Sequence, residues 1–260
     1  MSYLNKNLSL NYLKDIVDNN INIKTSFLPD EFKKEQIQAL EVFKKRVFLE
    51  EIIEETISFN KKLLWDNKNT NTSLVGNAEE LIEVFKLRSS VYKEISYQKE
   101  CPDVISGLNF DIFDKNSAVI FCKNNSTVSG TIRLIFDSKE GLPSEEKYSF
   151  FKQRENFGLI AEISRNIVKT RNKGLNLEFK YLMCGIYNIM KNNNVNLALS
   201  GIRSDHLKLF EKLGGVQVEK ELASYGNVNI PFFIISYNPN EASKFFKRIF
   251  LNKTSSVTRM

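Results

Sequence analysis

The sequence is poor in the residues that bind transition metals and act as bases in many hydrolases. It has one histidine, His206, and three cysteines, Cys101, Cys122 and Cys184, which lie far apart and form no CxxC pair. We therefore predict no zinc site, and we disfavour a serine hydrolase because its serine needs a histidine partner. The cysteines are interpreted as small core residues of a reduced protein.

Long apolar runs are also missing. The strongly apolar stretch at 228–237 is too short and too interrupted to span a bilayer. Residues 1–14 carry polar side chains throughout and lack the apolar core of a signal peptide. We therefore predict a cytoplasmic location.

Acidic residues are fewer than basic ones, 31 against 37, which gives a formal net charge of +6. Such an excess attracts nucleic acids, anionic membranes, acidic proteins or phosphate-bearing cofactors, and it does not choose among them. No RRM, zinc-finger or dense arginine–aromatic pattern is present, so we predict no nucleic-acid partner.

The pattern changes along the chain. Residues 1–73 are predicted to be a helical extension that ends in a polar linker at 66–73, residues 74–240 an α/β domain, and residues 241–260 an amphipathic helix and tail. In the central part the predicted helices are 79–95, 175–191 and 205–213, and the predicted strands are 117–122, 127–136, 159–168, 196–202, 216–223 and 228–237. This order indicates a mixed sheet with a functional notch, not a doubly wound Rossmann sheet. We expect the carboxy-terminal helix to pack on its own domain, with transient contact with a membrane surface as the alternative.

Charged residues interrupt several of these apolar segments. Strand alternation predicts Glu162 and Ser164 on one face and Arg165 on the other. Buried charges need partners because desolvation costs several kcal/mol per ion. We therefore predict one polar network, formed by Arg88, Asp111, Asp114, Arg133, Glu162 and Arg165. Composition alone leaves open whether this network is scaffold or active site.

The spacing of these charges resembles a known family. The motifs are Arg88 with Val91-Tyr92, Asp111-x-x-Asp114, Gly130-Thr131-x-Arg133-Leu134 and Glu162-x-Ser164-Arg165. Over residues 80–235 they are similar to the acyl-homoserine-lactone (autoinducer) synthases and to the related N-acyl amino acid synthases. Asn109 stands where the autoinducer synthases usually have an acid, and Tyr97 where they have a tryptophan, so the pattern is closer to the N-acyl amino acid synthases.

The resemblance implies a GNAT-like fold, a mixed central sheet flanked by helices. It also implies transfer of a fatty acyl group from a phosphopantetheine thioester, on acyl carrier protein or CoA, to a small amine. The residues that match the family's acceptor site are Arg88, Tyr92, Asp111, Asp114, Arg133 and Arg165. The thioester is a co-substrate, no permanently bound cofactor is expected, and acyl carrier protein is the expected protein partner.

A basic turn precedes the helix at 175–191. Arg171, Lys173 and Gly174 resemble the GNAT loop that binds a pyrophosphate. Backbone N–H groups at a helix N-terminus with basic side chains beside them suit a phosphate. A solvated turn is the alternative.

The chemistry requires a neutral amine and a stabilised oxyanion. We expect Glu162 to accept the amine proton and a backbone N–H of its strand to donate a hydrogen bond to the oxyanion. We expect Arg88 to bind a carboxylate of the acceptor. No side-chain nucleophile is evident, which favours direct transfer. Two other functions stay open: acetylation of a small amine or protein from acetyl-CoA, and a non-catalytic GNAT-like binding module.

Overall fold

The computed structural model describes residues 30–66, 71–169, 176–224 and 230–251. The chain divides into two compact units between Glu54 and Glu55. In the first unit the described residues belong to α2 (Asp30–Lys62), where Arg46 Nε lies 3.1 Å from Glu50 Oε1 one helical turn away. Every strand described below belongs to the second unit. The three-part division drawn from the sequence, with boundaries at 73 and 240, stays a prediction.

The second unit contains a seven-stranded mixed sheet in the order β1-β2-β3-β4-β5-β7-β6. Its strands are β1 (Thr72–Leu74), β2 (Ser117–Asn124), β3 (Thr127–Phe136), β4 (Ile160–Val168), β5 (Leu197–Arg203), β6 (Val216–Leu222) and β7 (Phe232–Tyr237). All neighbouring strands are antiparallel except β4 and β5, which are parallel. This mixed order confirms the fold class predicted from the sequence.

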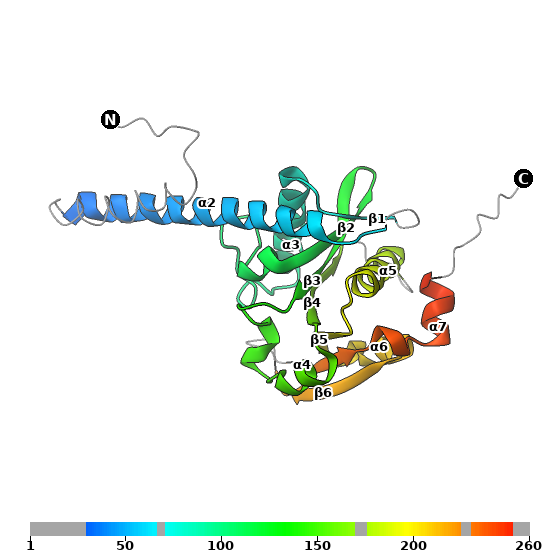
Figure 1. The fold of residues 1–260 in the computed structure, drawn as a ribbon. Coiled ribbons are helices and arrows are strands. Elements are labelled where there is room, and N and C mark those ends of the chain that lie inside the picture. Colours follow the sequence, from blue (N-terminus) through cyan, green and yellow to red (C-terminus); the bar gives the residue numbers. More distant parts are fainter. Residues whose placement is uncertain (1–29, 67–70, 170–175, 225–229, 252–260) are drawn as a thin grey trace, which may run out of the picture. The chain divides into compact units, whose positions relative to one another are not determined.

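Helices cover the sheet, and Figure 1 shows α3 and α5 on either side of its central strands. The helices are α3 (Ala78–Glu94), α4 (Phe151–Phe157), α5 (Leu177–Asn192), α6 (Leu207–Leu213) and α7 (Lys244–Phe246), with a short 3-10 helix η2 at Ile112–Asn116 and another, η3, at Pro143–Glu146. The two long helices begin at asparagine caps: Asn77 accepts from Glu80 N–H, and Asn176 accepts from the N–H groups of Glu178 and Phe179.

The alternation of β3 separates two faces of the sheet. Ile132 and Leu134 belong to the core under α5, whereas Ile135 belongs to a second core with Phe150 of the β3–β4 connection. Arg133 therefore lies on the face opposite α5. The strand predicted at 127–136 is β3.

Two segments bear on the predictions made for the linker at 66–73 and for the carboxy-terminal helix. Thr72 and Ser73, which were assigned to a linker, form β1 and pair with Cys122 and Phe121 of β2. The linker prediction is wrong for these two residues because pairing with the edge of β2 favours a strand more than their polar composition disfavours it. At the carboxy-terminal end, Phe246 and Phe250 are buried, so this segment packs on its own unit as expected. Among the described residues, none of the helices has the length and hydropathy needed to cross a membrane.

Candidate active site

The parallel strands β4 and β5 separate partway along their length. They pair only from Ile160 with Leu197 to Glu162 with Leu199, although β4 continues to Val168 and β5 to Arg203. Beyond this point the Ser200 hydroxyl donates to the Ile163 carbonyl at 3.0 Å. The notch predicted from the order of elements is therefore a divergence of two adjacent strands, with Glu162 at the last paired position.

A β-bulge in β4 sets the direction of Arg165. The register between β3 and β4 shifts between Thr131 and Arg133, so that β4 has one extra residue there. Arg165 has φ 52°, in the left-handed region that costs a non-glycine residue roughly 1 kcal/mol. Alternation predicted Arg165 on the face away from Glu162 and Ser164, and this is wrong: the bulge brings its guanidinium to Asp111, which also binds Arg133.

Five ionisable residues form one connected ion-pair cluster. Arg133 binds both oxygens of Asp111, with Nη1–Oδ1 2.6 Å and Nη2–Oδ2 3.1 Å. Asp114 Oδ1 lies 2.8 Å from Arg88 Nη1 and 3.1 Å from Arg133 Nη1. Arg165 Nη2 donates to Asp111 Oδ2 at 2.8 Å. We call these five residues the arginine–aspartate cluster.

The turn around η2 orients the two aspartates. Asp111 Oδ1 accepts from Phe113 N–H, and Asp114 Oδ2 accepts from Asp111 N–H, which is a reciprocal capping box. Arg133 is fixed from a third side because its Nε donates to Ser164 Oγ at 2.9 Å. The short Asp-x-x-Asp motif therefore holds both carboxylates in place before any ligand binds.

The cluster carries a surplus positive charge. Burial alone would raise the pKa of Asp111, but Arg133 and Arg165 outweigh burial and hold this pKa well below its ordinary value. Both aspartates have arginine partners, and three guanidinium groups face two carboxylates, which leaves one positive charge. The Arg88 side chain is 0% exposed, whereas those of Arg165 and Asp111 are 14% and 27% exposed. The cluster therefore reaches the surface at Arg165 and Asp111.

Tyr92 lies at this accessible end. Its ring is buried, and the Arg165 guanidinium carbon lies 5.3 Å from the ring centroid. This distance allows a cation–π interaction that restricts the arginine further.

Glu162 is buried close to the cluster without an ion pair to any of its arginines. Both carboxylate oxygens accept from Ser144: Oε2 from the backbone N–H at 2.9 Å and Oε1 from the hydroxyl at 2.8 Å. Burial raises the pKa of Glu162 to about 7, against the opposing effects of Ser144 and Arg133. The expectation that the arginines would pair with all three acids is thus wrong for Glu162, because η3 supplies its partner instead.

Ser144 was missed by the sequence reasoning, which assigned no element between the strands at 127–136 and 159–168. It lies in η3, whose first residue is Pro143. A proline followed by Ser-Glu-Glu is a helix-start pattern that was available in the sequence. The sequence held no signal that this turn would bind a glutamate 18 positions later.

The glycine at position 201 keeps the site open. Gly201 is exposed on β5, and a methyl group built on it would lie 4.0 Å from the Ser144 hydroxyl, its nearest neighbour. The Ser144–Glu162 pair therefore adjoins the diverging part of β4 and β5.

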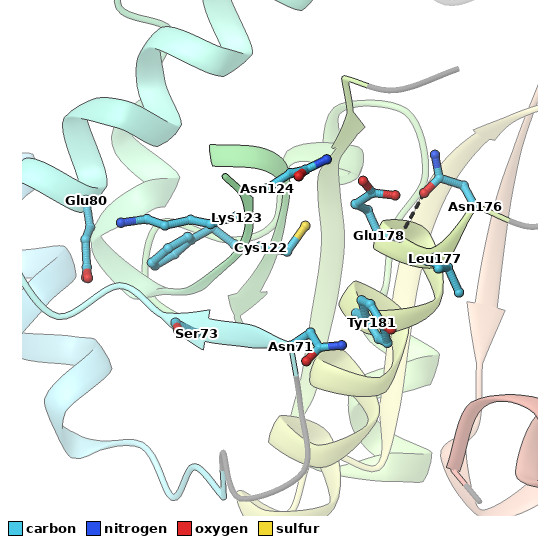
Figure 2. Close-up of a pocket in the computed structure, with 11 residues that line it drawn as sticks. Asn71, Ser73, Glu80, Cys122, Lys123, Asn124, Asn176, Leu177, Glu178 and Tyr181 are labelled. Carbon is cyan, nitrogen blue, oxygen red and sulfur yellow. Dashed lines mark hydrogen bonds between the residues drawn. The ribbon is translucent and has the colours of Figure 1, made fainter. Parts of the chain in front are cut away.

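A separate open hollow of about 710 Å³ lies between β1, β2 and the start of α5 (Figure 2). Lys123, Glu178 and Tyr181 are among the side chains around it, and no residue of the arginine–aspartate cluster lines it. The predicted phosphate-binding residues Arg171, Lys173 and Gly174 precede α5 and lie outside the described residues. Within the described part of the chain, no group of three or more His, Cys, Asp and Glu side chains is placed to hold a metal.

A family model for the N-acyl amino acid synthase FeeM matches residues 83–238, which is more than half of the chain and includes the whole cluster and Glu162. The chain belongs to the FeeM family. It is an N-acyltransferase, as the resemblance of its charged motifs to these synthases implied. No curated protein sequence matches the chain significantly.

Solved structures of this family and of related synthases share the fold. FeeM, an N-acyl amino acid synthase from uncultured soil microbes, has a TM-score of 0.51 at 17% identity, over 69% of this chain and 94% of FeeM. The acyl-homoserine-lactone synthase LasI has 0.51 at 16%, over 70% and 96%. The CoA-dependent acyl-homoserine-lactone synthase BjaI, with MTA, has 0.50 at 16%, over 66% and 80%. These similarities confirm the GNAT-like fold.

Proposed function

We propose that this enzyme of the FeeM family transfers a fatty acyl group from a phosphopantetheine thioester to the amino group of an amino acid or a similar small amine. The observation that carries the proposal is the surplus positive charge of the arginine–aspartate cluster beside Glu162. An amino acid brings a carboxylate, which such a cluster attracts, and an amine that needs a base. One site thus offers a partner for each group of the acceptor.

Arg165 is our candidate for the acceptor carboxylate. Arg88 was assigned this role from the sequence, but its guanidinium is fully buried against Asp114. The guanidinium of Arg165 is partly exposed, and among the described residues its carboxylate partner is Asp111 alone. Tyr92, which the sequence placed in the acceptor site, has a buried ring against Arg165, so it would act by holding Arg165 in place. The other cluster residues would then act indirectly, by holding Asp111 and Arg165 in position. They are Arg88, Asp114 and Arg133.

Glu162 is our candidate for the base. The acceptor amine arrives as an ammonium ion and gives one proton to Glu162, directly or through a water molecule. The nitrogen lone pair then attacks the thioester carbonyl carbon, and the oxyanion accepts a hydrogen bond from a backbone N–H of β4 beyond its pairing with β5. When the C–S bond breaks, the second amine proton neutralises the leaving thiolate, and the products are an amide and a free thiol. A carboxyl whose pKa is about 7 is suited to this exchange at neutral pH.

The donor would enter between the diverging strands. Where β4 and β5 no longer pair, backbone groups other than the Ile163 carbonyl, which accepts from Ser200, would be available to the amides of a pantetheine arm, and Gly201 contributes no side chain that would block it. Both acyl carrier protein and CoA present such an arm, so both are candidate donors. BjaI is described as CoA-dependent, and the net charge of +6 is suited to an acidic carrier protein.

Mass spectrometry of lipid extracts from bacterial cells that express the chain tests this function. We expect new N-acylated amino acids with the wild-type chain and not with the Glu162→Gln variant. Purified enzyme would then be assayed with fatty acyl-CoA or acyl carrier protein thioesters and pooled amino acids, by release of the free thiol. Acetylated amines as the only products would favour an acetyltransferase, and no new amide with any donor would refute the proposal.

A further inference from the structure

One residue of the connection between β3 and β4 binds the buried carboxyl group of Glu162. Ser144 donates its N–H to Oε2 at 2.9 Å and its hydroxyl to Oε1 at 2.8 Å. Both residues are nearly inaccessible, with 9% of Ser144 and 3% of Glu162 exposed. A carboxylate that is bound at both oxygens by one residue cannot rotate without breaking both hydrogen bonds.

The same connection is fastened at several points around Ser144. Arg154 of α4 makes paired hydrogen bonds with Asp137, at 2.6 and 2.8 Å, and with Glu145, at 2.5 and 2.6 Å. Glu145 also accepts from the N–H of Leu142, whose side chain is buried. These contacts lie on both sides of Ser144 in the chain, so the hydroxyl is held by the fold and not by the glutamate alone.

We propose that Ser144 is a positioning residue for acyl transfer: it orients the Glu162 carboxylate toward the diverging strands and stabilises its ionised form. The inference rests on the proposed role of Glu162 as base. Ser144 itself would touch neither the amine nor the thioester. Its two hydrogen bonds instead decide which oxygen lone pairs are free and at what pH the carboxylate is available.

Two charged residues in the described part of the chain also affect the pKa of Glu162. Arg133 on β3 lowers the pKa of Glu162, and Glu145 on η3 raises it, although Arg154 pairs with Glu145. On β4, Arg165 is directed to Asp111, and on α3, Arg88 is directed to Asp114. The adjacent β5 residues, Leu199 to Gly201, carry no titratable side chain. The Ser144 hydroxyl is therefore the donor whose removal should change Glu162 most directly.

The test compares Ser144→Ala with two control variants. Titration of the Glu162 carboxyl carbon by ¹³C NMR, assigned with Glu162→Gln, should show a pKa higher by roughly one pH unit in Ser144→Ala, since one hydrogen bond to the anion is lost. The acid limb of kcat/KM should move up by the same amount. Ser144→Thr, which keeps the hydroxyl, should restore both values, and Ser149→Ala, a nearby exposed serine, should change neither.

Each outcome decides a different point. An unchanged Glu162 pKa, or a loss of activity equal at every pH, would overturn the proposal and leave Ser144 a structural residue. A raised pKa with an unmoved acid limb would break the link to catalysis. If the wild-type enzyme formed no amide with any donor, the proposed function would fail. The NMR titration would still decide whether Ser144 controls Glu162.

Discussion

Glu162 combines burial with two hydrogen bonds from Ser144, and its two possible roles, base and scaffold, predict different behaviour of one variant. Glu162→Gln keeps the shape of the side chain and removes the base. If Glu162 accepts the amine proton, kcat should fall by roughly 10²–10⁴-fold. Raising the pH should restore part of the rate, because more of the acceptor amine is then already neutral. Steady-state kinetics between pH 6 and 9 would measure this, and a folded variant with full activity would make Glu162 a scaffold residue.

The same substitution has a predicted effect on stability. The pKa of Glu162 rises on folding from its ordinary value of 4.5 to about 7, so the folded state favours the protonated carboxyl. The stabilisation is complete below pH 4.5 and is lost as pH rises through 7. Between pH 5 and pH 8 the free energy of unfolding of the wild type should therefore fall by about 2 to 3 kcal/mol relative to Glu162→Gln. Urea denaturation of both proteins measures it, and parallel pH profiles would contradict the raised pKa.

Arg165 provides a second test, which compares two ion pairs that have similar lengths and differ in burial. Arg165→Met leaves the partly buried Asp111 with Arg133 alone and should lower the free energy of unfolding by about 3 kcal/mol. Arg203→Met breaks the more exposed pair with Asp205, a 2.7 Å contact, and should cost under about 1 kcal/mol. Equal losses in urea denaturation would show that the cluster adds no more to stability than a surface pair.

At the scale of elements, most helices and strands could be predicted from periodicity because their apolar faces are buried in a regular pattern. The strand at 127–136 was predicted with the bounds of β3. The β4 bulge could not be predicted, because an extra residue changes which face Arg165 occupies without changing the composition. The contact of Ser144 with Glu162 depends on how a long connection folds back, which no local pattern records. The sequence thus predicted which residues form the arginine–aspartate cluster better than it predicted which of these residues pair with each other.

The divergence of β4 and β5 predicts a specific sensitivity at Gly201. The nearest atom to an added Cβ is 4.0 Å away, so Gly201→Ala should be tolerated in both folding and activity. Gly201→Leu should extend into the space between the strands and raise the KM for the acyl donor at least roughly tenfold, with little change for the acceptor. Circular dichroism and thermal unfolding would confirm that both variants fold. An unchanged donor KM in Gly201→Leu would place the pantetheine arm elsewhere.

At the scale of the whole molecule, the net charge of +6 bears on the choice of donor, which the fold leaves open. If acyl carrier protein docks through long-range attraction, raising the salt concentration from 50 to 300 mM should raise the KM for the carrier-bound donor several-fold, since screening shortens the Debye length to below about 10 Å. The same acyl chain on pantetheine alone, which lacks the carrier protein and the phosphates, should show almost no salt effect. Acyl-CoA should fall between them, because its phosphates supply a smaller charge. Thiol-release assays with the three donors measure this, with Glu162→Gln as the background for reaction of the protein's own cysteines. A salt response that is equal for the carrier-bound and pantetheine donors would show that the positive charge does not recruit a carrier protein, and it would favour CoA or a neutral contact surface.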